Sequence, residues 1–241
     1  MHRFFAQRTD EKTAVLPPDE ARHALTVLRL RPGDAVQAAV EGALYEARIL
    51  DAAEETRVEL LEELPSPEPL THVTLYQGLP KGDKMDYIAQ KCTEAGVYAV
   101  SPVQMPRCVA KTDARDGEKK AERWRRIALE AAKQSGRTRA PEISAPISQR
   151  DMLDSLKKHG LILVPWEDAR GVSVKGALKM SAALDIAVVI GPEGGMGDDE
   201  VMALKAAGAV PVTLGRRIFR TETAGLAALM MILYEKGDYE G

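Results

Sequence analysis

The chain is poor in cysteine and in aromatic residues. Its 241 residues include two cysteines, and aromatic residues make up 5%. Cys92 and Cys108 have no spacing typical of a zinc site or of a disulfide framework. The histidines are also scattered along the chain, so the sequence predicts no metal site. They are His2, His23, His72 and His159.

Long apolar runs are absent as well. The longest nearly unbroken run covers residues 224–234, whereas a membrane-spanning helix needs about 20 residues. The N-terminus carries charges at Arg3, Arg8 and Asp10 and lacks the apolar stretch of a signal peptide. We therefore expect a cytoplasmic protein with reduced thiols and no membrane contact.

Charge is segregated along the chain, although the formal net charge is only −3. Residues 107–140 hold eleven lysines and arginines against five acids, and residues 41–70 hold two arginines against nine acids. Such asymmetry favours a basic face for a polyanion on an otherwise acidic body. A solvated helix face is the alternative interpretation of the basic segment.

Three prolines in five residues, Pro65, Pro67 and Pro69, mark a linker, because proline continues neither a helix nor a central strand. We place a domain boundary there, giving domains 1–67 and 68–241. The sequence of the first domain predicts short strands and one helix at residues 19–28, which suggests a small β-barrel. Its predicted strands are residues 3–6, 35–40, 44–51 and 56–64.

The second domain alternates strands and helices, which predicts an α/β fold with a parallel sheet. Residues 186–190 are all apolar and should be buried on both faces of the sheet. Asp198 is the expected N-cap of the helix that Gly208 ends. The other predicted strands are 72–77, 98–103, 161–164 and 210–214, and the helices are 83–95, 118–135, 198–207 and 221–235.

Ligands of open α/β sheets bind beyond the carboxyl ends of the strands, and two segments there stand out. Residues 191–197 contain four glycines and Glu193. They match neither the dinucleotide-binding fingerprint nor the phosphate-binding P-loop, so a structural turn and a ligand loop both remain open. Residues 214–224 contain three arginines, which suits a nucleoside-like ligand or an ordinary surface loop.

Five motifs, in order, carry a family resemblance. They are residues 23–34; residues 81–97; residues 122–124 with 130–131 and 134–137; residues 190–195; and residues 214–215 with 220–224. Together they resemble the ribosomal RNA small subunit methyltransferase E family, the 16S rRNA uracil-N3-methyltransferases of the SPOUT superfamily. The departures are Ala95 for leucine, Met196-Gly197 for an aromatic or leucine followed by serine, and Phe219 for leucine.

The resemblance implies a small N-terminal PUA-like β-barrel and a C-terminal SPOUT-type parallel sheet with a trefoil knot. It also implies a homodimer that binds S-adenosylmethionine. Members of the family methylate N3 of the uridine at position 1498 of 16S rRNA, preferring the 30S subunit to naked RNA. Because N3 lies on the Watson–Crick edge, the target base must be unpaired or flipped out.

The resemblance also implies site residues. Arg220 would hold the uracil carbonyls, and Glu193 or Glu222 would act as the base. The cofactor-binding residues would be Pro165, Gly191, Glu193, Gly194, Gly195, Leu214, Gly215, Ile218, Phe219 and Arg220. The RNA-binding residues would be Arg3, His23, Arg29 and Arg31 in the barrel, and Lys81, Lys84, Arg123, Arg137 and Arg139 beyond it.

Three alternatives remain. One is a knotted methyltransferase with another RNA target, and another is a non-catalytic RNA-binding or ribosome-assembly factor. A nucleotide-dependent oxidoreductase is disfavoured because the phosphate-binding fingerprint is missing.

Overall fold

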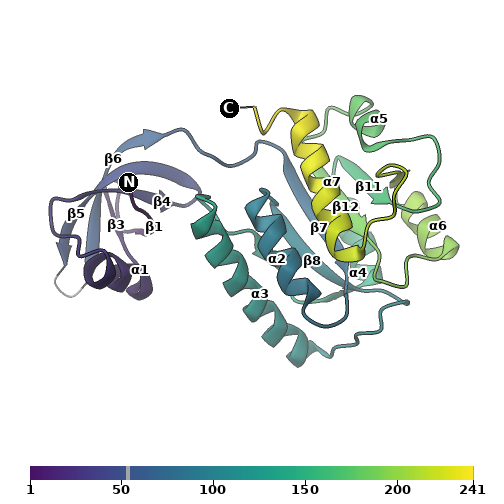
Figure 1. The fold of residues 1–241 in the computed structure, drawn as a ribbon, viewed down its shortest axis with the longest axis horizontal. Coiled ribbons are helices and arrows are strands. Elements are labelled where there is room, and N and C mark those ends of the chain that lie inside the picture. Colours follow the sequence, from purple (N-terminus) through teal and green to yellow (C-terminus); the bar gives the residue numbers. More distant parts are fainter. Residues whose placement is uncertain (53–54, 241) are drawn as a thin grey trace. The chain divides into compact units, whose positions relative to one another are not determined.

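The protein is described by a computed structural model that covers residues 1–52 and 55–240. The chain forms two compact units (Figure 1). The first comprises Met1–Glu68 together with Ala132–Ala140, and the second comprises Pro69–Ala131 and Pro141–Gly241. Nothing in the local sequence pattern predicted that Ala132–Ala140 belongs to the first unit.

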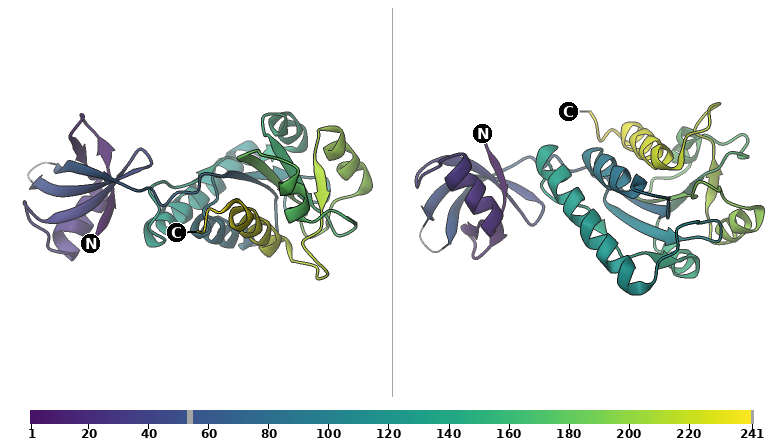
Figure 2. Two further views of the ribbon diagram at one scale, coloured as in Figure 1. Left: turned by 90° about the horizontal axis from the view of Figure 1, so that it is seen from above. Right: turned by 60° about the horizontal axis from the view of Figure 1, so that its bottom comes forward.

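The first unit is built on a six-stranded, curled sheet (Figure 2), which confirms the predicted N-terminal β-domain. Phe4, Val36, Ile49 and Val58 are buried inside it, as alternating positions of their strands require. The strand order is β1 (Arg3–Phe5), β4 (Ala35–Val40), β5 (Ala43–Ala52), β6 (Thr56–Leu64), β3 (Thr13–Val15) and β2 (Gln7–Arg8).

The helix predicted at residues 19–28 is only partly α-helical. Helix α1 (Pro18–Arg22) passes into the π-helix η1 (His23–Val27), in which the amide of Leu28 donates to the carbonyl of His23 at 3.0 Å. Arg29 follows with a φ of 58°, a left-handed conformation that residues other than glycine rarely adopt. The segment therefore ends in a wide turn that a simple helical period does not predict.

The second unit contains a seven-stranded sheet whose main path runs β10-β8-β7-β12-β11-β13, with β9 paired to β8. Its described pairings are parallel, as predicted. Ile186–Ile190 lie in the sheet interior and are buried, which confirms the prediction from their unbroken apolar run. The strands are β7 (His72–Gly78), β8 (Ala99–Gln104), β9 (Glu142–Ile143), β10 (Ile147–Ser148), β11 (Leu161–Pro165), β12 (Asp185–Ile190) and β13 (Val210–Val212).

Four of the helices were predicted, and two shorter ones were missed. The predicted ones are α2 (Lys84–Glu94), α3 (Ala114–Gln134), α6 (Asp198–Ala206) and α7 (Thr221–Lys236). The missed ones are α4 (Gln149–Leu156) and α5 (Val174–Lys179), whose caps are the hydroxyls of Ser148 and Ser173. The prediction that Asp198 caps α6 was wrong. The N-cap is Gly197, whose amide donates to the Glu200 carboxylate at 2.8 Å.

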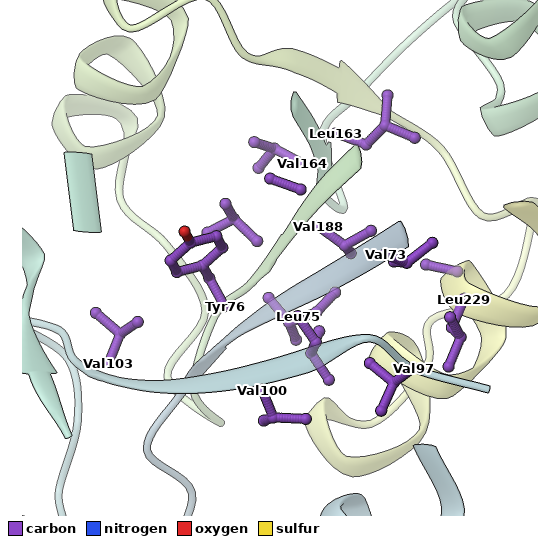
Figure 3. Close-up of a cluster of buried hydrophobic side chains, with 14 of the residues drawn as sticks. Val73, Leu75, Tyr76, Val97, Val100, Val103, Leu163, Val164, Val188 and Leu229 are labelled. Atoms are coloured by element: carbon purple, nitrogen blue, oxygen red, sulfur yellow. The ribbon is translucent and has the colours of Figure 1, made fainter. Parts of the chain in front are cut away.

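Helices cover both faces of the second sheet. Leu75 of β7 faces α7, because a Cβ on Gly225 would lie 3.1 Å from its methyl groups. The next residue, Tyr76, faces the other way and its hydroxyl lies 3.0 Å from His159 Nε2. Figure 3 shows this core, with Leu75 and Leu229 among the buried side chains. The trefoil knot stays a prediction of the resemblance.

Candidate active site

The parallel pairings bring the two predicted loops to one edge of the sheet. Ile190, at the end of β12, pairs with Gln77 of β7, and Pro165, at the end of β11, pairs with Val212 of β13. The segments that leave these strands therefore start side by side. They include the glycine-rich residues 191–197 and the arginine-containing residues 214–220.

Gln77 and Thr221 tie three of these segments together. Gln77 is fully buried, and its Nε2 donates to Thr221 Oγ1 at 2.9 Å and to the Gly78 carbonyl at 3.1 Å. The same Thr221 hydroxyl donates to the Gly191 carbonyl at 2.7 Å. One hydroxyl thus joins the end of β7, the start of the glycine-rich loop and the first turn of α7.

The glycines of residues 191–197 are used for close packing. A Cβ on Gly191 would lie 2.9 Å from Met196 Cγ, and a Cβ on the facing Gly78 would lie 2.6 Å from the Pro192 nitrogen. Gly195 has a φ of 67°. The loop is therefore folded tightly against β7 and presents backbone groups rather than side chains.

Lys84 lies between the two candidate bases. Its Nζ is 3.0 Å from Glu193 Oε1 and 3.1 Å from Glu222 Oε2. These two contacts raise the pKa of Lys84. Burial alone would raise the pKa of Glu193, but hydrogen bonds from the Lys81 amide, at 3.0 Å, and from Lys84 hold it below its usual range. Lys84, predicted to contact RNA, is thus part of an ion-pair cluster.

Arg220 is the N-cap residue of α7. Its carbonyl accepts hydrogen bonds from the amides of Thr223 and Ala224, whereas its side chain is exposed and has no partner among the described residues. Ile218 is 81% exposed, and Phe219 and Leu214 are half-buried. This loop therefore offers apolar surface at the edge of the sheet, together with exposed guanidinium groups, of which Arg220 lies nearest α7.

Arg107 was not predicted as a site residue, although it begins the basic segment 107–140. Its Nη1 donates to the Gly194 carbonyl at 3.3 Å, and its Nε lies 3.9 Å from Glu200 Oε2. A Cβ on Gly197 would meet Arg107 Nη2 at 2.9 Å. Arg107 therefore covers the glycine-rich loop from outside, a contact that no local sequence signal indicates.

The predicted RNA-binding residues divide into two groups. His23, Arg29, Arg31 and Lys81 are exposed. The side chains of the others are engaged by the protein or half-buried. Arg3 donates to Gln37 Oε1 and to the Gly136 carbonyl, Arg123 pairs with Asp86, and Arg139 is half-buried.

Arg137 has a structural role in the first unit. Its side chain is 6% exposed and its Nη2 lies 2.6 Å from Glu68 Oε2. The same carboxylate accepts from the Thr138 amide at 2.7 Å. Burial would raise the pKa of Glu68, but Arg137 and the neighbouring amides lower it. A buried arginine that is paired in this way is poorly placed to bind phosphate.

Two further properties concern the described residues as a whole. They contain no group of three or more histidine, cysteine, aspartate or glutamate side chains arranged to hold a metal ion. Within residues 1–52 and 55–240, no helix combines the length and the apolar character needed to cross a membrane.

Comparisons with known proteins place this arrangement in a class. A family described as "RNA methyltransferase domain" matches residues 66–233, and one described as "RNA methyltransferase PUA domain" matches residues 16–63. The chain is therefore an RNA methyltransferase with a PUA domain, and the predicted α/β parallel sheet with a small PUA-like N-terminal domain is confirmed.

Curated relatives define the family more narrowly. Ribosomal RNA small subunit methyltransferase E of Bacillus subtilis is 32% identical over 98% of this chain and 97% of its own length. The protein of the same name from Mycobacterium bovis is 36% identical over 90% of this chain and 84% of its length. The chain belongs to the ribosomal RNA small subunit methyltransferase E family.

Solved structures agree with this assignment. The crystal structure of a ribosomal RNA small subunit methyltransferase E from Neisseria gonorrhoeae, bound to S-adenosyl methionine, has a TM-score of 0.81 and 32% identity over 97% of each chain. A putative methyltransferase from Legionella pneumophila, also in complex with that cofactor, has a TM-score of 0.78 and 27% identity over 96% of each chain.

The hydrogen bonds that the Thr221 hydroxyl forms with Gln77 and Gly191 can be tested by substitution. We expect Thr221→Val to lower the free energy of unfolding by about 1–3 kcal/mol, because it deprives buried Gln77 and the Gly191 carbonyl of their shared partner. Urea denaturation measures the loss. Thr221→Ser keeps the hydroxyl and should stay closer to wild type. A Thr221→Ser variant that loses as much stability as Thr221→Val would show that keeping the hydroxyl does not preserve the tie made by Thr221.

Proposed function

We propose that the protein transfers a methyl group from S-adenosylmethionine to N3 of the uridine at position 1498 of 16S rRNA, acting on the 30S subunit. The observation that carries the proposal is the edge of the second sheet, where Thr221 joins a glycine-rich loop to an arginine-containing loop. Family membership over nearly the whole chain supports the rRNA substrate. A ribosomal substrate also favours a cytoplasmic location.

The residues at this edge fit the cofactor. Glycine backbone at residues 191–197 allows close approach, and apolar side chains on the second loop suit an adenine ring. The residues proposed to hold it are Pro165, Gly191, Glu193, Gly194, Gly195, Leu214, Gly215, Ile218, Phe219 and Arg220. When bound, S-adenosylmethionine supplies an electrophilic methyl group on its sulfonium.

The protein itself must bind the uracil and deal with its N3 proton. We assign the unpaired guanidinium of Arg220 to the uracil carbonyl oxygens, where it stabilises the negative charge that develops as the proton leaves. Glu193 and Glu222 are the carboxylates proposed to receive this proton. The lowered pKa of Glu193, which the Lys81 amide and Lys84 hold down, makes its carboxylate a weaker base than an unpaired glutamate.

On the first unit, the proposed RNA contacts are the exposed side chains of His23, Arg29 and Arg31. Lys81 is exposed beside the glycine-rich loop of the second unit and is proposed to add a phosphate contact there. The strained φ of Arg29 supports a functional role, because left-handed non-glycine residues gather at functional positions.

We also propose that the enzyme is a homodimer through the outer face of α7. This helix is apolar around much of its circumference, and its Met230, Met231 and Tyr234 side chains are 48%, 36% and 67% exposed. A helix that is apolar on all sides is normally buried. A second copy of the same chain would cover this face.

The dimer proposal predicts that Met230→Glu combined with Tyr234→Glu gives a monomer in sedimentation velocity, because the interface would bury two charges without partners. Met202→Glu is the matched control, since Met202 of α6 is also an exposed methionine, at 66%. A wild-type monomer, or a dimeric double variant, would contradict the proposal.

Methyl transfer tests the proposed reaction directly. Labelled S-adenosylmethionine is offered with 30S subunits that lack the modification, with naked 16S rRNA and with 50S subunits. We expect label at N3 of the proposed uridine, chiefly in 30S particles. Label elsewhere would indicate another RNA target, and no label with no cofactor binding would indicate a non-catalytic assembly factor.

The role of Arg220 predicts a loss of kcat. If its guanidinium stabilises charge in the transition state, Arg220→Ala should lower kcat on saturating 30S subunits about 100-fold or more. Arg217→Ala is the matched control, because Arg217 is an exposed arginine of the same loop. An Arg220→Ala enzyme with full kcat would remove Arg220 from the mechanism.

A further inference from the structure

Helix α3 has one buried face and one strongly basic face. Ala121, Trp124 and Ala128 are buried against the core of the second unit. At 3.6 residues per turn, Arg115, Lys119 and Arg126 point the opposite way and fall within about 40° of one another around the helix axis. The first and the last of them are eleven positions apart, or about 16 Å along the axis. We call these three residues the α3 basic stripe.

Two other arginines of α3, Arg123 and Arg125, are used by the fold. Arg123 pairs with Asp86 of α2, and the two helices lie side by side in Figure 1. Arg125 lies 2.6 Å from Glu118 and donates to the Ile143 carbonyl at 2.8 Å. These contacts hold α3 in place and explain those two arginines without any ligand.

The stripe residues have no such explanation. All three are exposed, and none forms a hydrogen bond or ion pair with another described residue. Arg115 and Lys119 are four residues apart, a spacing at which like charges destabilise a helix. Glu122 lies among the stripe residues along the helix, and it too has no ion-pair partner in the described chain. No contact among the described residues therefore accounts for this concentration of positive charge.

We propose that the α3 basic stripe binds the phosphate backbone of ribosomal RNA and so positions the enzyme on its substrate. The inference rests on the proposed function and adds a surface to it. Three cations in line along a rigid helix match a polyanion. The helix's one aromatic residue, Trp124, is buried. The stripe thus offers no ring for base stacking, which single-stranded RNA would favour. The contact is to phosphates and carries no sequence information.

A charge-neutralised variant tests the stripe. In Arg115→Gln/Lys119→Gln/Arg126→Gln, KM for 30S subunits should rise while kcat at saturation stays near wild type, because the substituted residues lie outside the proposed cofactor and uracil sites. The slope of log affinity against log salt concentration should become shallower by about 3, roughly 1 for each phosphate that the variant no longer neutralises. Protein-free 16S rRNA should show the same change in binding.

Two controls sharpen the test. Arg150→Gln/Lys158→Gln/Lys179→Gln removes the same charge from exposed residues elsewhere in the second unit and should leave the salt slope unchanged. Glu122→Gln removes the acid that lies among the stripe residues. It should lower KM for 30S subunits, the opposite of the effect expected of the stripe variant. Thermal unfolding of each variant within a few degrees of wild type would establish that the fold is intact.

The outcomes separate the surface from the reaction. The RNA-binding role of the stripe would be overturned if the folded stripe variant had the salt slope and the KM of the wild type. Normal turnover by the wild type would at the same time leave the proposed function standing. A defect on 30S subunits but not on protein-free rRNA would assign the stripe to a ribosomal protein and also overturn the RNA contact. If the wild-type chain transferred no methyl group, the proposed function would fail. The salt slope of rRNA binding would still show whether the stripe contacts RNA.

Discussion

The candidate active site depends on one hydroxyl group. Oγ1 of Thr221 accepts from buried Gln77 and donates to the carbonyl of Gly191. These residues come from β7, α7 and the loop after β12, and the parallel sheet alone brings their backbones only to the same edge. The hydroxyl fixes where the glycine-rich loop begins relative to the helix that follows the arginine-containing loop. The spacing of the two loops, and any pocket between them, therefore follows from a contact at their base rather than at their tips.

The first unit is organised around a buried carboxylate in a similar way. Glu68 accepts from the Arg137 side chain and from the amides of Thr138 and Arg139. The ion pair is nearly excluded from solvent, so removal of either partner would leave an uncompensated charge. Residues 132–140 are held by this contact to a unit that ends, along the chain, at Glu68 itself. Glu68 and Thr138 are thus in contact although they are 70 positions apart in the sequence, and the Thr138 hydroxyl adds a second contact to the Gly42 carbonyl at 2.7 Å.

The sequence was informative where a pattern is local and long. Ala35–Val40 and Thr56–Leu64 were predicted to the residue, and the all-apolar strand at Ile186–Ile190 was placed correctly in the sheet interior. The six-residue helix α5 has too few turns to show a clear period. The N-cap of α6 was misplaced because the Glu200 side chain, not Asp198, satisfies the first amide.

The site was predictable in outline and not in its contacts. Parallel strands place their following loops at one edge, so residues 191–197 and 214–220 could be joined from the sequence. Gln77 and Thr221 are 144 positions apart, and Arg107 and Gly194 are 87 apart. No local pattern reports such contacts. For the same reason Lys84 and Arg137 resembled free cations in the sequence, although tertiary structure gives each a carboxylate partner.

Arg29 shows how thermodynamic and functional selection can diverge at one position. The turn after the π-helix forces a φ of 58°, which glycine would adopt without steric cost. Arginine there lowers the stability of the unit by about 1 kcal/mol or more relative to an unstrained residue. Directed evolution for heat resistance alone would therefore be expected to select glycine at this turn. If arginine were instead retained in a library selected for activity, its retention would indicate selection for RNA contact. Sequencing the library would detect this without any structural measurement.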